Sequence, residues 1–168
     1  AADRAIRAGA VAITLHARTR QDGAWGPKYA GAANWEYISD LKKHEPRVPI
    51  IGNGDIVSPQ TALDMIDQTG CDAIMVGRAA VGRPWIFAEI EQFLKTGEIL
   101  PEPAPSDVLA VAWHHIHEKI RATPEPPAVV VRSMRKGMAA YIKGWPGSLE
   151  LRNKLMQIEE PQDVRILF

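Results

Sequence analysis

Short apolar runs alternate with helix-like segments along the N-terminal part of the chain. The three clearest runs, each typical of a strand buried on both faces, are 11–15, 48–51 and 72–76. Between the second and third runs, Ser58 can cap the first amides of a helix, Pro59 suits its first position, and Gly70 ends it. The pattern therefore predicts a unit of strand, helix and strand.

Polar residues follow each apolar run. About 25 residues separate the ends of the second and third runs, which allows a right-handed helical crossover between parallel neighbouring strands. The turn 52–55 (GNGD) and the pair Gly77-Arg78 would then lie at one edge of the sheet, and His16 follows the first run in the same way. We expect these groups to form one site.

Helical patterns and breakers fill the rest of the chain. Asn34 can cap a helix that ends before Pro46, Gly97 ends a helix from about residue 84, and the long loop 21–33 is expected beside the active site. A stiff, proline-rich linker follows at 100–105. Beyond it the pattern is helical throughout, with further helices at 106–122 (capped by Ser106), 128–143 and from 148, and a short one near the C-terminus.

These elements predict an α/β fold. A complete (β/α)8 barrel has eight strands and about 250 residues, whereas this chain offers three strands. We expect part of a TIM barrel at residues 1–99, the linker at 100–105, and a small all-helical domain, truncated, at 106–168; the family resemblance described below implies that the barrel part is its last three strands and helices. The chain is expected to be a fragment of a longer protein.

Composition excludes few classes of protein. The chain has 168 residues, 46% of them hydrophobic, with 20 Lys and Arg against 20 Asp and Glu. No apolar run approaches the length of about 20 residues that a membrane helix needs, so we expect no membrane partner. Its single cysteine allows no intramolecular disulfide, and the expected location is the cytoplasm.

The balanced charge is unevenly distributed. Residues 89–118 carry six acidic and one basic side chain, and residues 128–154 carry six basic and one acidic. On the predicted helix 128–143, one arc of about 100° holds the cations while apolar side chains lie opposite. Such a face is either ordinary solvated surface or a contact for a phosphodiester backbone. Its cations are Arg132, Arg135, Lys136 and Lys143.

The residues after the strands suit a phosphate. Glycines 52, 54 and 77 let the backbone approach a ligand, and Arg78 adds a full positive charge with forked donors. In (β/α)8 barrels a phosphate site lies after the last two strands. The alternative is that these are plain turn glycines. The histidines at 114, 115 and 117 have no further converging ligands in sequence, so no metal site is expected.

Several motifs in this order resemble the C-terminal part of the tRNA-dihydrouridine synthases, and most closely their bacterial B-type branch. The resemblance covers nearly the whole chain and rests on 15–20 (LHARTR), 29–31 (YAG), 34–35 (NW), 50–56 (IIGNGDI), 69–73 (TGCDA), 75–80 (MVGRAA), 82–85 (GRPW), 134–136 (MRK) and 141–147 (YIKGWPG).

The resemblance implies an FMN-dependent enzyme that uses NADPH to reduce the 5,6 double bond of particular uridines in tRNA. It implies that the helical domain holds tRNA, which fits the cationic face, and that Arg18 and Arg20 steer RNA toward the flavin. The target uridine must leave its stack to reach the ring. The residues that would bind FMN, chiefly at its phosphate end, are Asn53, Gly54, Asp55, Gly77 and Arg78, with His16 approaching the flavin.

The family's proton-donating cysteine follows an earlier barrel strand, so no catalytic residue is expected in this chain. Cys71 precedes its strand and is expected to be a small buried residue. The fragment alone is expected to be inactive. Two alternatives stay open: an FMN-dependent TIM-barrel oxidoreductase acting on a small molecule, and a non-catalytic RNA-binding fragment.

Overall fold

The computed structural model describes residues 1–19 and 31–163, and its contacts divide the chain into two units. The first unit comprises Ala1–Ala80 and Trp85–Leu100, and the second comprises Val81–Pro84 and Pro101–Phe168. The short segment Val81–Pro84 thus belongs to the second unit although the chain on both sides of it belongs to the first. Nothing in the sequence pattern indicated this assignment.

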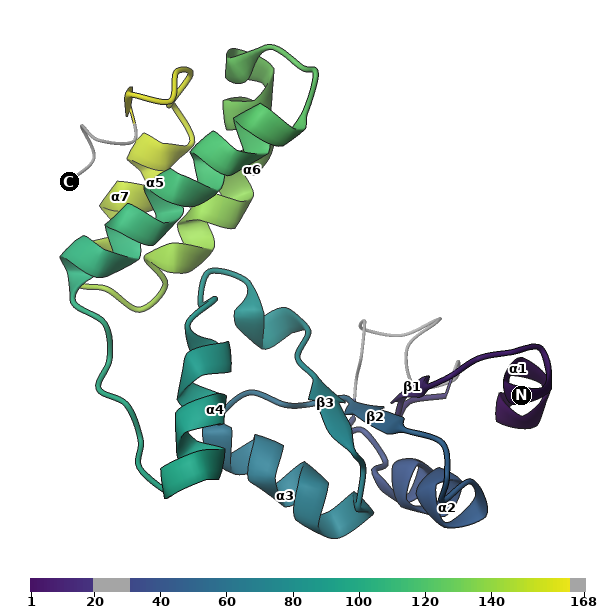
Figure 1. Ribbon diagram of the computed structural model, residues 1–168. Coiled ribbons are helices and arrows are strands. Elements are labelled where there is room, and N and C mark those ends of the chain that lie inside the picture. The colour runs from purple at the N-terminus through teal and green to yellow at the C-terminus, as the bar shows by residue number, and fades with distance from the viewer. Residues whose placement is uncertain (20–30, 164–168) are drawn as a thin grey trace. The chain divides into compact units, whose positions relative to one another are not determined.

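The first unit contains a parallel three-stranded sheet of order β1-β2-β3 (Figure 1). Its strands are β1 (Ile13–His16), β2 (Ile50–Asn53) and β3 (Ala73–Met75). His16 is in register with Asn53, which is in register with Met75. The predicted α/β class and the parallel neighbours are therefore confirmed, and the carboxyl ends of all three strands lie at one edge.

Helices connect these strands, and local signals mark their ends. The Ser58 side chain accepts a hydrogen bond from the Thr61 N–H, and the Thr61 hydroxyl accepts one from the Ser58 N–H. Gly70 then ends the helix with φ of 66°. The first unit contains α1 (Ala2–Arg7), α2 (Glu36–His44), α3 (Pro59–Thr69), the 3-10 turn η1 (Arg78–Ala80) and α4 (Ile86–Thr96).

The core of the first unit packs α3 closely against β2. A Cβ atom at Gly52 would lie 2.5 Å from the Met65 sulfur and 3.2 Å from the Cys71 sulfur. The small size of Gly52 therefore permits this close helix packing, a role that its place in the sequence did not indicate. Cys71 is 5% exposed, as expected for a small buried residue. The fully buried side chains around them include Ile38, Ile50, Met65 and Ile86.

The described part of the second unit contains three α-helices, α5 (Pro105–Ala122), α6 (Pro127–Tyr141) and α7 (Ser148–Leu155). The apolar face predicted for α6 is buried, at Val130, Met134, Met138 and Tyr141. The predicted cap at Ser106 was wrong, because Pro105 occupies the first helical position and Ala104 precedes it without a side-chain bond. No helix among the residues described is both long and apolar enough to cross a membrane.

One close backbone contact shapes the second unit. Gly82 has φ of 74°, and a Cβ atom there would lie 2.4 Å from the backbone carbon of Ala140 in α6. Only glycine allows this approach, because any side chain would overlap backbone that cannot move aside. Val81–Pro84 is thereby held against the helix.

Candidate anion site at the strand ends

A cavity of about 710 Å³ opens at the carboxyl ends of the three strands. It lies wholly within the first unit. The residues that the sequence predicted for a cofactor all line it: His16, Asn53, Gly54, Asp55, Gly77 and Arg78. Arg18, which was predicted to contact RNA, lines it as well.

The Asp55 carboxylate joins three segments at this cavity. Arg18 Nη2 donates to both of its oxygens, at 2.6 and 2.7 Å. Arg78 Nη2 donates to Oδ1 at 3.3 Å, and the Ala33 backbone N–H donates to Oδ2 at 2.7 Å. One carboxylate therefore fixes the end of β1, the loop before α2 and the first residue of η1.

The charge on Asp55 is well supported. Burial acts to raise the pKa of its carboxyl group, but the hydrogen bonds from Arg18 and Ala33 and the positive charge of both guanidinium groups outweigh that effect. The pKa is consequently below its ordinary value of 3.8. With two arginines and one aspartate at this point, the local charge is positive and favours an anion.

Backbone geometry turns Asp55 toward its partners. Gly54 has φ of 129° and Asp55 has φ of 58°, a left-handed conformation that aspartate adopts more readily than most residues. A Cβ atom at Gly54 would lie 2.7 Å from that of Ala33, and Trp35 Nε1 donates to the Gly54 carbonyl at 3.0 Å. Gly54 therefore allows both the turn and the close packing of the neighbouring loop.

The two arginines at Asp55 differ in exposure. The Arg18 side chain is 4% exposed, whereas that of Arg78 is 66% exposed. Arg78 can therefore reach a ligand in the cavity, while Arg18 acts on the site through Asp55. A Cβ atom at the neighbouring Gly77 would meet no atom within 4 Å, so the backbone there borders open space.

The remaining two predicted residues occupy the edge of the sheet. Asn53 Nδ2 donates to the Met75 carbonyl at 2.6 Å and links the ends of β2 and β3. The exposed His16 has its Nε2 atom 3.4 Å from Arg18 Nη1. Both side chains thus lie among the groups that Asp55 organises.

The residues predicted to bind nucleic acid do not form one uniform surface. Arg20 lies outside the described residues. Arg132, Lys136 and Lys143 are exposed. Arg135 instead donates from Nε and Nη2 to the Ile158 carbonyl, at 2.9 and 2.6 Å, and so holds the chain after α7.

Histidines outside the cavity have other contacts. His115 Nδ1 lies 3.0 Å from the Tyr141 hydroxyl, and the ring of His117 packs on Trp113 with centroids 4.4 Å apart. These contacts contribute to the packing of the second unit.

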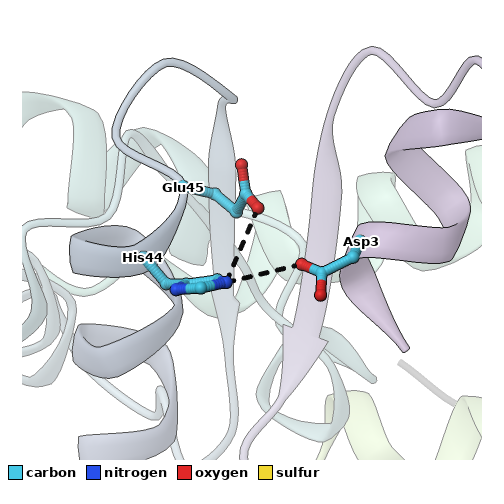
Figure 2. Close-up of side chains that lie close together, drawn as sticks. All are labelled: Asp3, His44 and Glu45. Atoms are coloured by element: carbon cyan, nitrogen blue, oxygen red, sulfur yellow. Dashed lines mark ion pairs between the residues drawn. The ribbon is translucent and has the colours of Figure 1, made fainter.

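A separate cluster of ligand-type groups, Asp3, His44 and Glu45, links α1 to the end of α2 (Figure 2). His44 Nε2 lies 3.6 Å from Asp3 Oδ1 and 3.9 Å from Glu45 Oε1. His44 and Asp3 are largely exposed, and the cluster has the character of a surface ion pair.

Fold and cavity together define an α/β protein with a cationic site at the carboxyl ends of parallel strands, where α/β proteins commonly bind ligands. A sequence model of the family described as dihydrouridine synthase matches residues 1–168. The chain belongs to that family, and the resemblance inferred from its motifs is confirmed.

Curated relatives agree with this assignment. The chain is similar to tRNA-dihydrouridine synthase B of Pseudomonas aeruginosa, with 38% identity over 156 residues that cover 93% of this chain and 45% of that protein. It is also similar to a probable tRNA-dihydrouridine synthase of Mycobacterium leprae, with 39% identity over 152 residues that cover 90% of this chain and 38% of that protein. The chain thus spans less than half the length of these relatives.

Proposed function

We propose that this chain is part of an FMN-dependent oxidoreductase that reduces particular uridines of tRNA to 5,6-dihydrouridine with NADPH. Membership of the dihydrouridine synthase family and the names of the relatives support the reaction. Flavin mononucleotide, when bound, supplies hydride transfer between NADPH and the uracil ring. The observation that carries the proposal is the cavity at three adjoining strand ends, with Arg78 at its edge.

The residues present fit the phosphate end of such a nucleotide. Arg78 offers a largely exposed guanidinium group, and Gly77 borders open space in which a phosphate has room. The negative charge of Asp55 is matched by Arg18, so it does not cancel the attraction of Arg78 for an anion. In this proposal Asn53, Gly54 and Asp55 form the turn that faces the cofactor, and His16 faces it from β1.

Arg18 takes a different role from the one its motif implied. Its side chain is buried against Asp55, which places it as a positioning residue for that carboxylate rather than as an RNA contact. Contacts to RNA fall in this proposal to Arg20 and, in the second unit, to the exposed cations Arg132, Lys136 and Lys143.

The same proposal extends to the fold of the two units. We propose that β1, β2 and β3 are the last three strands of a (β/α)8 barrel and that α5, α6 and α7 belong to a helical tRNA-binding domain. The parallel order of the strands and the position of the cavity support this arrangement. The proton-donating cysteine implied by the family would come from outside this chain.

Replacing Arg78 tests the flavin site. In the full-length protein, wild type should bind FMN more tightly than riboflavin, because only FMN has a phosphate for Arg78. The Arg78→Leu variant should lose about tenfold or more in FMN affinity while riboflavin affinity stays nearly constant. Flavin fluorescence quenching measures both constants. Arg47→Leu is the matched control, since Arg47 is exposed and does not line the cavity.

Two results would count against the proposal. If Arg78→Leu keeps the preference for FMN over riboflavin, the phosphate lies elsewhere. If the yellow full-length protein oxidises NADPH but forms no dihydrouridine in unmodified tRNA, a small-molecule substrate becomes the better assignment.

A further inference from the structure

The second unit has a groove of about 470 Å³ between α6 and the α7 region. Its lining combines two cations, one amide and three apolar side chains, and it includes no acidic residue: Lys136, Ala139, Leu149, Arg152, Asn153 and Met156. Such a mixture is unusual for plain solvated surface, where charges of both signs are interspersed.

The two cations of this groove come from different helices. Lys136 is on α6 and Arg152 is on α7, and both are exposed without an ion pair to the described residues. Lys154, also on α7, pairs instead with Glu150 at 2.9 Å. Arg135 is committed to the Ile158 carbonyl. The groove therefore pairs Lys136, which belongs to the cationic arc predicted for α6, with Arg152 of α7, which lies outside that arc.

Apolar surface lies beside these charges. Leu149 is 72% exposed and Met156 is 38% exposed, although both are large hydrophobic residues. Contact with a partner would remove this apolar area from water, which is favourable. A partner that suits the groove must therefore present both negative charge and flat apolar surface.

We propose that this groove binds RNA, with Lys136 and Arg152 contacting backbone phosphates and with Leu149 and Met156 contacting a ribose or an unpaired base. Nucleic acid provides regularly spaced phosphates beside bases that pack on apolar side chains. Asn153 adds an amide that can hydrogen-bond a base edge or a 2′-hydroxyl. The inference rests on the proposed tRNA substrate and assigns a particular face of the second unit to it.

The test measures tRNA binding by the full-length protein at several salt concentrations, using fluorescence anisotropy. Arg152→Ala and Lys136→Ala should each weaken binding severalfold and reduce the slope of log affinity against log salt by about one, as expected for one lost phosphate contact. Leu149→Ser should weaken binding without changing the slope. Arg152→Lys should restore most of the slope.

Lys154→Ala is the matched control, because it removes a cation from the same helix but not from the groove. It should leave affinity and slope unchanged. Circular dichroism and flavin content verify that every variant is folded and that the strand-end cavity is intact.

Two results would overturn the inference. If Arg152→Ala and Lys136→Ala bind tRNA like Lys154→Ala, the groove does not contact RNA, although the proposed function stands because wild type still binds. If wild type binds no tRNA at any salt concentration but binds an acidic protein segment through this groove, both the inference and the proposed substrate fail.

Discussion

The strand-end cavity and the α6–α7 groove both present two cations, but they hold them differently. In the cavity, Arg18 and Arg78 share the carboxylate of Asp55, which fixes their guanidinium groups before any ligand arrives. In the groove, Lys136 and Arg152 have no acidic neighbour in the lining. A fixed cation loses less conformational entropy on binding, whereas a mobile one adapts to irregular surfaces. The cavity thus suits one small anion, and the groove suits a long flexible polyanion.

The largest expected effect comes from Asp55→Asn. A small effect would contradict the difference drawn between cavity and groove, because it would mean that the carboxylate does not hold Arg18. Removing one partner leaves the buried guanidinium group of Arg18 without its counter-charge, and the free energy of unfolding should fall by about 3 kcal/mol. Urea denaturation of the full-length protein measures the loss. Glu91→Gln, which removes an exposed partner of Lys95, is the control and should leave the free energy of unfolding nearly unchanged.

Adding Arg18→Leu to Asp55→Asn should recover part of the lost stability, because the buried charge is then gone. The stability loss caused by Arg18→Leu alone is the reference. If Arg18→Leu causes the same loss in the Asp55→Asn background, the two side chains act independently.

Acid should reduce the stability that Asp55 contributes at the strand-end cavity, by a smaller amount. The pKa of Asp55 is lower in the folded state than its ordinary value of 3.8, so its contribution to stability is present above pH 3.8 and is lost as the pH falls through the folded-state pKa. Wild type should therefore lose more stability than Asp55→Asn below that pH. Thermal unfolding across the acid range measures the difference, and parallel curves for the two proteins would contradict the assignment.

The smallest effect is expected at the exposed cluster of Asp3, His44 and Glu45. This cluster provides an exposed ion pair against which the buried pair of Arg18 and Asp55 can be measured. His44→Gln should change the free energy of unfolding by less than about 0.5 kcal/mol, because solvent screens exposed ion pairs. Urea denaturation at neutral pH is sufficient. A loss of stability as large as that of Asp55→Asn would mean that solvent exposure does not determine how much these ion pairs contribute to stability.

Local signals predicted much of the fold. Ser58, Pro59 and Gly70 mark the two ends of α3 as expected, because capping depends on residues that are adjacent in sequence. The apolar runs and the crossover length predicted three parallel strands, and hence one shared edge for His16 and Asn53.

Contacts between distant residues could not be predicted in this way. Arg18 and Asp55 are 37 positions apart, and nothing near either residue indicates their pairing. Gly52 resembles a ligand-binding glycine in sequence, but the sulfur atoms near it come from α3 and from the turn that precedes β3. Arg135 matches the cationic arc of α6, yet a carbonyl beyond α7 engages it. Each case depends on tertiary packing, which periodicity does not encode.

The contact between Gly82 and Ala140 means that the second unit is not a continuous stretch of chain. A fragment cut at residue 100 would carry all three helices yet lack Val81–Pro84, and it would leave that part of α6 bare. During synthesis, these four residues leave the ribosome well before α6, so they can pack against α6 only after that helix has been synthesised. Exchanging the C-terminal portion between relatives would therefore require the tetrapeptide to be transplanted with it.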